Sequence, residues 1–360
     1  MKLSAEAGLW CTRALDAPAP LVAVLEVSGA VLSWLVDDAD AEPQITFTDV
    51  RGADWLWRVV GETGHATVAT ALNGGPAAGD LEIAGVDVLP GALDALRRLA
   101  VGHWLRRWWP ASHRDAIAVL DAAVLDGEIA VLTAGAQEFF GDDTFDSDVT
   151  QLLEPHAAAL SSAALQGDPR IGELAGRCRE IAEDVGVAWD VPVAAVRRDD
   201  YALAAGADIG RGADHFVASG VASINWSAVP AGVFDAAENT VAWAVEADRD
   251  TVQAMVSADL LGGGSPNGIP VRLRAGGFGG SGSLSADGRC RFAITGADGQ
   301  PATDSQGWNH DWRATAVSVG AEVEESAEMR ERVRALARSR LDRPGDDAFL
   351  AEILAAESDY

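Results

Sequence analysis

The sequence predicts an α+β protein: a β-containing N-terminal unit with a helical middle region, followed by an antiparallel β-sandwich with a helical C-terminal tail. Three observations predict this class. Apolar residues recur at helical spacing over much of residues 90–205 and 323–360. They alternate with period two over residues 206–322. Short turns separate these alternating segments, which disfavours a parallel sheet because parallel strands need long crossovers.

The predicted N-terminal domain covers residues 1–205 and begins with a β-rich part at 21–89. Apolar or alternating stretches there predict strands at residues 21–37, 45–50, 54–60 and 81–89. The Ser28-Gly29 pair divides the first stretch into two strands with a turn between them. We therefore expect a small sheet before the helical region.

Residues 90–205 are predicted to be mainly helical. The helix candidates are residues 93–109, 113–140, 149–165 and 170–185. Asp148 is a predicted N-cap, and Pro155 predicts a kink or break in the helix that follows it. Gly186 is expected to end the last helix.

The predicted sandwich covers residues 206–322. Seven short strands are expected there, at residues 217–226, 240–247, 251–260, 269–276, 282–286, 290–295 and 312–323. The turn sequence Ser285–Gly288 predicts a hairpin. Residues 277–282 fit G-x-G-x-x-G, but no helix is expected after them, so we interpret them as a flexible turn rather than a dinucleotide site.

Two helices are predicted in the tail, over residues 324–341 and from Asp346 or Asp347 onward. The second is short and amphipathic. It either docks on the protein's own β-domain or inserts into a partner's groove, and we favour docking because most amphipathic helices are held by their own core.

The charge excludes several function classes. The 360 residues hold 55 Asp and Glu against 27 Lys and Arg, a formal charge of −28 that repels nucleic acid and anionic membrane surfaces. Lys2 is the only lysine, so 27 − 1 = 26 of the cationic residues are arginine. A P-loop ATPase or a Schiff-base enzyme needs a lysine in its site, and we expect neither class. We also expect no cofactor.

The cysteines and the apolar runs predict a cytoplasmic protein. Cys11, Cys178 and Cys290 are too widely spaced for a disulfide framework or a zinc site, and we expect no metal. The N-terminus does not have the pattern of a signal peptide, and no apolar run approaches the length that spans a bilayer.

The densest chemical cluster lies in residues 103–114, which hold three Trp, three Arg and two His. Arg and Trp are enriched where proteins bind partners. The residues that we predict to bind are His103, Arg106, Arg107, Trp108, Trp109, His113 and Arg114. In the structural alternative, Trp104 and Trp108 share a helix face and fill a core while the arginines pair with local acids.

Two further segments are weaker candidates. Trp308 and His310 lie in a polar, aromatic stretch that forms a binding loop or, alternatively, a buried Trp pair at the end of the sandwich. Four aspartates at 142, 143, 146 and 148 suggest a cation loop, but they lack the EF-hand spacing and fit a solvated, helix-capping loop better.

Residues 103–115, with the helices after them, and residues 346–360 are similar to uncharacterised proteins of actinomycete type. The resemblance runs over most of the chain. It implies a high-GC bacterial origin and no particular activity.

The leading functional hypothesis is a non-catalytic adaptor or accessory subunit that binds a protein partner in the bacterial cytoplasm. It depends on the lack of any G-x-S-x-G, H-E-x-x-H or C-x-x-C signature together with the Arg/Trp cluster. The alternative is a hydrolase or peptide-modifying enzyme. Its site would gather His103, Arg106, Arg107 and His113 with an aspartate of residues 142–148. A small-molecule ligand stays open in both.

Overall fold

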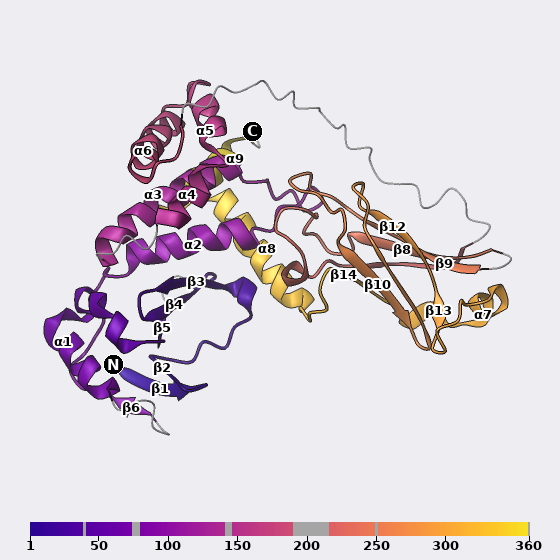
Figure 1. The fold of residues 1–360 in the computed structure, drawn as a ribbon, viewed down its shortest axis with the longest axis horizontal. Helices are drawn as coiled ribbons and strands as arrows, with labels where there is room; N and C mark the ends of the chain where they lie inside the picture. Colours follow the sequence, from indigo (N-terminus) through magenta and orange to yellow (C-terminus); the bar gives the residue numbers. More distant parts are fainter. Residues whose placement is uncertain (39–40, 74–79, 141–145, 190–215, 249–250, 359–360) are drawn as a thin grey trace. The chain divides into compact units, whose positions relative to one another are not determined.

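The computed structural model describes residues 1–38, 41–73, 80–140, 146–189, 216–248 and 251–358, and it confirms the α+β class (Figure 1). The chain divides into two compact units. Unit 1 comprises Met1–Arg107, Leu120–Ala194 and Arg338–Tyr360, and unit 2 comprises Trp108–Val119 and Ala195–Ala337. The expected boundary at residue 205 lies outside the described residues. The expected tail is divided at residue 337, because its first part packs with unit 2 and its last part with unit 1.

Unit 1 contains a six-stranded antiparallel sheet with the order β3-β4-β5-β2-β1-β6. Its strands are β1 (Lys2–Glu6), β2 (Leu9–Cys11), β3 (Val22–Val27), β4 (Ala30–Leu35), β5 (Gln44–Phe47) and β6 (Leu81–Glu82). The two strands predicted around Ser28-Gly29 and the strand near residue 45 are confirmed. The β1–β2 hairpin was not predicted. It turns through Ala7 and Gly8, both with positive φ, and only Leu3 of β1 is buried.

The strand expected at residues 54–60 is wrong. A 3-10 turn at Asp54–Leu56 leads there into helix α1 (Trp57–Leu72), which kinks at Gly61. Trp55, Leu56, Val59 and Val60 are buried. Their spacing matches one helical face as well as an apolar strand, so packing rather than local sequence decided the element. The strand expected at 81–89 shrinks to the two residues of β6.

The other helices of unit 1 are α2 (Asp94–Trp108), α3 (Ala122–Phe140), α4 (Asp146–Leu153), α5 (Ala157–Ala164), α6 (Pro169–Val185) and α9 (Leu350–Ser358). The break near Pro155 and the left-handed Gly186 after α6 are confirmed. The helix expected from residue 113 begins only at Ala122, where the Asp121 carboxylate accepts the first backbone N–H groups. Asp148 lies inside α4 rather than at its N-cap.

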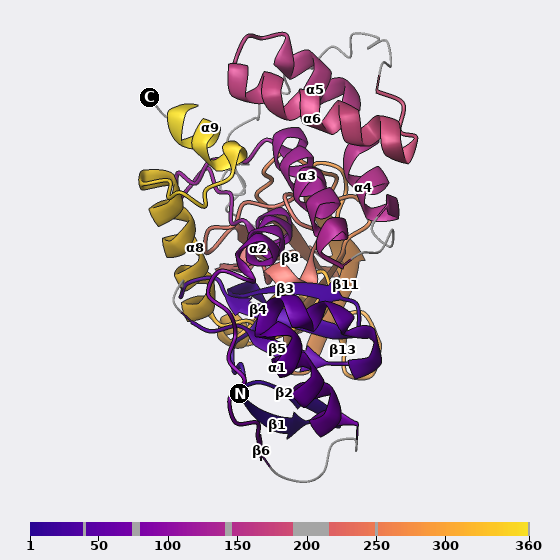
Figure 2. The same cartoon turned by 90° about the vertical axis from the view of Figure 1, so that its left-hand side faces the viewer.

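The tail helix α9 docks in the core of unit 1, not on the β-domain. Phe349 and Ile129 of α3 both lie close to Gly102 of α2, within 3.0 Å of where a Cβ would stand. The Trp104 indole donates to the Pro20 carbonyl and so ties α2 to the segment before β3. Helices α5 and α6 run side by side in both views (Figures 1 and 2).

Unit 2 contains two antiparallel four-stranded sheets, with the orders β12-β9-β8-β7 and β13-β11-β10-β14. Their strands are β7 (Phe216–Ala222), β8 (Val241–Asp248), β9 (Thr251–Ala258), β10 (Pro270–Ala275), β11 (Phe278–Ser283), β12 (Arg289–Ala293), β13 (Thr295–Gly296) and β14 (Ala316–Val319). The helices are α7 (Asp304–Asn309) and α8 (Ala327–Asp342), and the division between the units falls within α8.

The hairpin expected at Ser285–Gly288 is wrong. The turn exists, but it joins β11 to β12, which belong to different sheets. The segment expected as a flexible turn forms strand β11, which pairs with β10. A Cβ at Gly280 or Gly282 would lie 2.8 Å from the ring of Phe292 in β12, so these strand positions are glycine because the other sheet packs against them.

Unit 2 also buries two arginines of α8. Arg330 donates to both carboxylate oxygens of Glu238, at 2.8 and 2.9 Å, and Arg334 donates to one of them at 3.0 Å. Burial opposes the ionisation of Glu238. The hydrogen bonds from Arg330, Ser223 and Arg334 outweigh it and lower the pKa of Glu238 to about 2.

Over the part of the chain that the structure describes, no helix combines the length and the apolar character that a bilayer crossing requires.

Candidate functional site

The structure divides the predicted Arg/Trp/His cluster between the two units. His103, Arg106 and Arg107 lie on α2 in unit 1. Trp108, at the end of that helix, belongs to unit 2, as do Trp109, His113 and Arg114 in the segment that follows. The two parts therefore have different surroundings, and each is described by itself.

The part on α2 adjoins a buried carboxylate that sequence reasoning missed. Asp126 of α3 forms an ion pair with Arg106, whose Nε lies 3.0 Å from its Oδ1, and its Oδ2 lies 3.1 Å from His156 Nε2. Burial, and then the charge of Arg106, lower the pKa of His103, while the charges of Asp148 and Asp126 partly oppose this. Helices α2 and α3 and the turn before α5 thus bring His103, Arg106, Asp126 and His156 into one polar cluster. No motif in the sequence marks Asp126, since it stands in an ordinary helix.

The part in unit 2 holds a loop in place. The buried carboxylate of Asp235 accepts from Ser112 Oγ at 2.6 Å and from the backbone N–H groups of His113 and Arg114. The Trp109 indole donates to the Ala118 carbonyl at 2.8 Å. Arg114 pairs with Asp259. These contacts give the segment a structural role, while the side chains of His113 and Arg114 remain exposed.

The cysteines form no metal site among the described residues, and most of the predicted acidic loop lies outside them. Residues 141–145, with Asp142 and Asp143, lie outside the described residues, and Asp148 is a residue of α4. No three His, Cys, Asp or Glu side chains among the described residues are grouped as metal ligands. Burial raises the pKa of the Cys178 thiol to about 12 and that of Cys290 to about 11, which disfavours the nucleophilic thiolate.

The two tryptophans in the segment around α7 differ in exposure. Trp312 is buried and donates from Nε1 to the Gly307 carbonyl, whereas Trp308 is 55% exposed. The Trp308 indole donates to Asp304 Oδ1 at 3.1 Å, one helical turn earlier. His310 contacts the rings of Phe278 and Trp312 edge-to-face, and its Nε2 is buried with no hydrogen-bond partner in the described structure. Of the predicted buried pair, only Trp312 is buried, and Trp308 is exposed.

The base beneath Trp308 is well held. The side chains of Thr303 and Gln306 form a reciprocal capping box at the start of α7. Gly307 packs against the side chains of Val252 and Ala247, where a Cβ would lie 2.9 Å from Val252. Helix α7 therefore presents the exposed indole from a base fixed on β8 and β9, near β13 in Figure 1.

Only two of the twelve tryptophans are exposed, Trp57 in unit 1 and Trp308 in unit 2. The Trp57 ring carries the guanidinium of Arg58, 4.8 Å from its centroid. Among the described residues, no cation stacks on Trp308. We define the α7 surface as Asp304, Ser305, Trp308, Asn309 and Asp311, of which Asp304 is half-buried and the others exposed.

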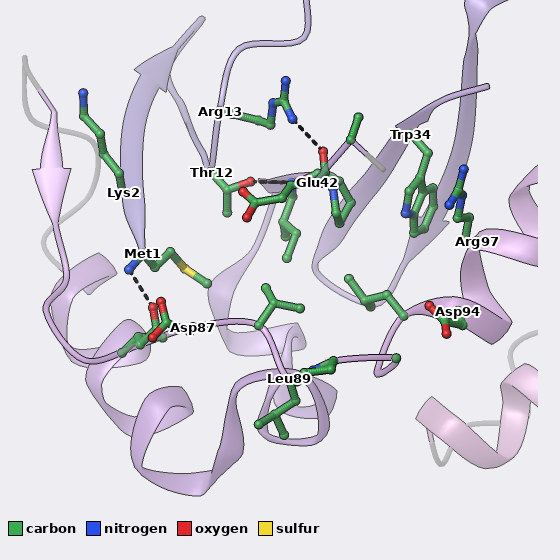
Figure 3. Close-up of a pocket in the computed structure, with 18 residues that line it drawn as sticks. Met1, Lys2, Thr12, Arg13, Trp34, Glu42, Asp87, Leu89, Asp94 and Arg97 are labelled. Carbon is green, nitrogen blue, oxygen red and sulfur yellow. Dashed lines mark hydrogen bonds between the residues drawn. The ribbon is translucent and has the colours of Figure 1, made fainter. Parts of the chain in front are cut away.

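Unit 1 also contains a cavity of about 490 Å³ beside its sheet (Figure 3). Its walls include the buried side chains of Trp34, Ile45 and Leu93, and this volume suits a small ligand. Charged side chains of both signs line it in equal number, Lys2, Arg13 and Arg97 against Glu42, Asp87 and Asp94. This balance selects neither an anion nor a cation, so the cavity points to no particular ligand.

The chain matches no protein-family model, no curated protein and no solved structure. The resemblance to actinomycete-type proteins therefore stays a prediction.

Proposed function

We propose that the protein is a non-catalytic adaptor that binds a protein partner through the α7 surface of unit 2. One observation carries this proposal: a tryptophan that is more than half exposed is held in a defined orientation on a rigid base. Exposed aromatic rings that become buried in a complex are the residues that most often dominate binding energy.

The orientation of Trp308 matters as much as its exposure. A side chain that is already ordered loses less conformational entropy when a partner covers it. The hydrogen bond to Asp304 and the capping box of α7 provide that order. Burying the exposed part of the ring is worth about 2 kcal/mol, roughly a thirtyfold change in affinity.

The test uses Trp57 as a matched control. The full chain, tagged at its N-terminus, is purified natively from the organism that encodes it, as wild type, as Trp308→Ala and as Trp57→Ala. We expect a stoichiometric partner with wild type and with Trp57→Ala, and at least about tenfold weaker binding with Trp308→Ala. Equal binding by all three variants, or a single species with no partner at any salt concentration, contradicts the proposal.

The enzyme alternative has weaker support. In its favour, the pKa of His103 is lowered and a buried carboxylate, Asp126, lies beside the same helix, as at many acid–base sites. Against it, Asp126 is already occupied by Arg106 and His156, and the backbone at His113 and Arg114 serves to bind Asp235 in unit 2. Hydrolysis of ester or peptide substrates by wild type, lost in His103→Ala and in Asp126→Asn, would favour the enzyme.

A further inference from the structure

We infer that the α7 surface accepts a cationic side chain, foremost an arginine, that the partner places on the face of Trp308. This inference rests on the proposed adaptor function and names the chemistry of the partner. It follows from the ring geometry, from a second tryptophan in the same chain and from the charge around the ring.

The indole edge of Trp308 has a partner, while more than half of the residue is open to a ligand. Nε1 at the ring edge donates to Asp304 Oδ1 at 3.1 Å, so the edge is satisfied and a carboxylate stands beside it. The residue is 55% exposed. A cation over a Trp face is attracted by the ring quadrupole, and Trp is the best of the aromatic side chains for this contact. The Asp304 carboxylate adds a charge of the sign that a guanidinium needs.

Trp57 shows what the chain does with its other exposed tryptophan. Trp57 is 43% exposed, and the Arg58 guanidinium lies 4.8 Å from the centroid of its ring. The same guanidinium lies 5.7 Å from the Phe139 ring. At Trp57 the chain thus supplies its own cation, whereas no residue of the described structure supplies one at Trp308.

The charge near Trp308 selects a cation over an anion. Asp304 and Asp311 both belong to the α7 surface. Arg313 is 4.0 Å from Asp311, and with side chains 93% and 74% exposed this pair is weak. The chain as a whole carries −28. A basic partner is therefore attracted over long range, and an acidic or phosphorylated partner is repelled.

The experiment titrates the full chain with hexa-arginine and with hexa-citrulline, which has nearly the same shape without the charge. The indole N–H resonance of Trp308, assigned by its loss in Trp308→Phe, reports the site. We expect hexa-arginine to shift this resonance and hexa-citrulline to leave it unchanged. Affinity is measured by calorimetry at physiological ionic strength, because an acidic chain also binds polycations non-specifically.

Neutral substitutions separate the site from that background, because they leave the net charge unchanged. We expect Trp308→Leu, which keeps the apolar bulk without a π face, to weaken hexa-arginine binding by about fivefold. Trp308→Phe should weaken it less, and Trp57→Ala should leave it unchanged.

A second pair of variants tests the carboxylate. Asp304→Asn and Asp54→Asn each remove one negative charge, the second three residues before Trp57. Asp304→Asn should weaken hexa-arginine binding more than Asp54→Asn. Circular dichroism checks that each variant is folded.

Two results overturn the inference. One is an unshifted Trp308 resonance with hexa-arginine. The other is equal affinity of wild type and Trp308→Leu. If the native partner nevertheless depends on Trp308, the adaptor function stands and only the cation is wrong. If no native partner depends on Trp308 while hexa-arginine binds there, the cation site stands and the adaptor function is wrong.

Discussion

Two ion-pair clusters, one in each unit, bury charge in opposite ways. In the cluster of unit 2 the cations are buried, since the side chains of Arg330 and Arg334 are 6% and 3% exposed, and their shared partner Glu238 is 29% exposed. In unit 1 the anion is buried, since the Asp126 side chain is 4% exposed and its partner Arg106 is 51% exposed. This difference indicates on which residue the stability of each cluster depends. Removing Glu238 takes a shared partner from two buried cations, whereas removing Asp126 leaves cations that reach water.

The identity of the buried group adds a second difference. Arginine stays protonated under all ordinary conditions, so the buried cations of unit 2 cannot lose their charge to relieve a missing partner. The cluster of unit 1 contains histidines, and the pKa of His103 is lowered, so protons change its charge in a milder pH range. The following substitutions test whether the two clusters differ in this way, and they are given from the largest expected effect to the smallest.

Glu238→Gln has the largest expected effect. It removes the carboxylate that Arg330 and Arg334 share, and we expect the free energy of unfolding to fall by about 3 kcal/mol, as for other buried ion pairs that lose one partner. Urea denaturation measures the change. Glu331→Gln removes an exposed partner of Arg334 and should cost less than about 0.5 kcal/mol. A loss below about 1 kcal/mol for Glu238→Gln would show that unit 2 does not depend on this group.

Gly102→Ala tests whether unit 1 depends on close helix packing instead. The new Cβ would lie 2.8 Å from Ile129 Cγ1 and 3.0 Å from Phe349 Cζ, so we expect a loss of about 2 kcal/mol. Gly135→Ala in α3 is the matched control, because nothing lies within 4 Å of its Cβ position. The control should gain up to about 1 kcal/mol from helix propensity. Equal unfolding midpoints for the two variants would contradict the packing argument.

Asp126→Asn breaks the comparison if it costs as much as Glu238→Gln. We expect a loss of about 1 kcal/mol in the free energy of unfolding. The amide keeps part of the hydrogen bonding, and Arg106 is half-exposed and regains water. The same urea denaturation gives the value, with Arg106→Gln as the reciprocal variant that leaves the buried acid with His156 only.

The lowered pKa of His103 predicts that the stability of unit 1 depends weakly on pH. Burial and Arg106 lower its pKa in the folded state, so the unfolded chain takes up the proton first as the pH falls. Stability is therefore full above the ordinary histidine pKa of about 6.5 and declines below it, by at most about 1.4 kcal/mol per pH unit. His103→Gln should reduce the difference between unfolding free energies at about pH 7.5 and about pH 5.5. An unchanged difference contradicts this origin.

The lowered pKa of Glu238 predicts a separate loss of stability at acidic pH. Its pKa is lowered to about 2, so its contribution is present above the ordinary glutamate pKa and lost as the pH falls toward 2. The two pH ranges distinguish the units in one experiment, since His103 acts near neutrality and Glu238 only in acid. If Glu238→Gln removed the loss near neutrality, the contrast between the units would be wrong.

Local signals made several elements predictable. Helix α6 has Pro169 at its start, a regular apolar stripe and the left-handed Gly186 at its end, and all three act within the segment itself. Strands β8 and β9 pair directly across a short connection, and the buried positions of β9 alternate strictly. Elements of this kind carry their own boundaries, so a single sequence is enough to place them.

Other elements depended on distant residues. Strand β11 is glycine-rich because Phe292 of the other sheet occupies the space of its side chains. The buried Asp126 has no sequence signal, because its partners Arg106 and His156 come from other segments. The predicted Arg/Trp/His cluster combined residues by proximity in sequence, and the fold assigned them to two units.

The sequence by itself determined the α+β class, most of the helices and strands and the acidity of the chain, because these follow from composition and local periodicity. Only the tertiary structure decided which tryptophans are presented. Trp308 and Trp312 stand four residues apart in similar surroundings, yet one ring fills the core and the other faces water. Exposure is a property of what packs around a residue, and in this chain those neighbours come from strands far away in the sequence.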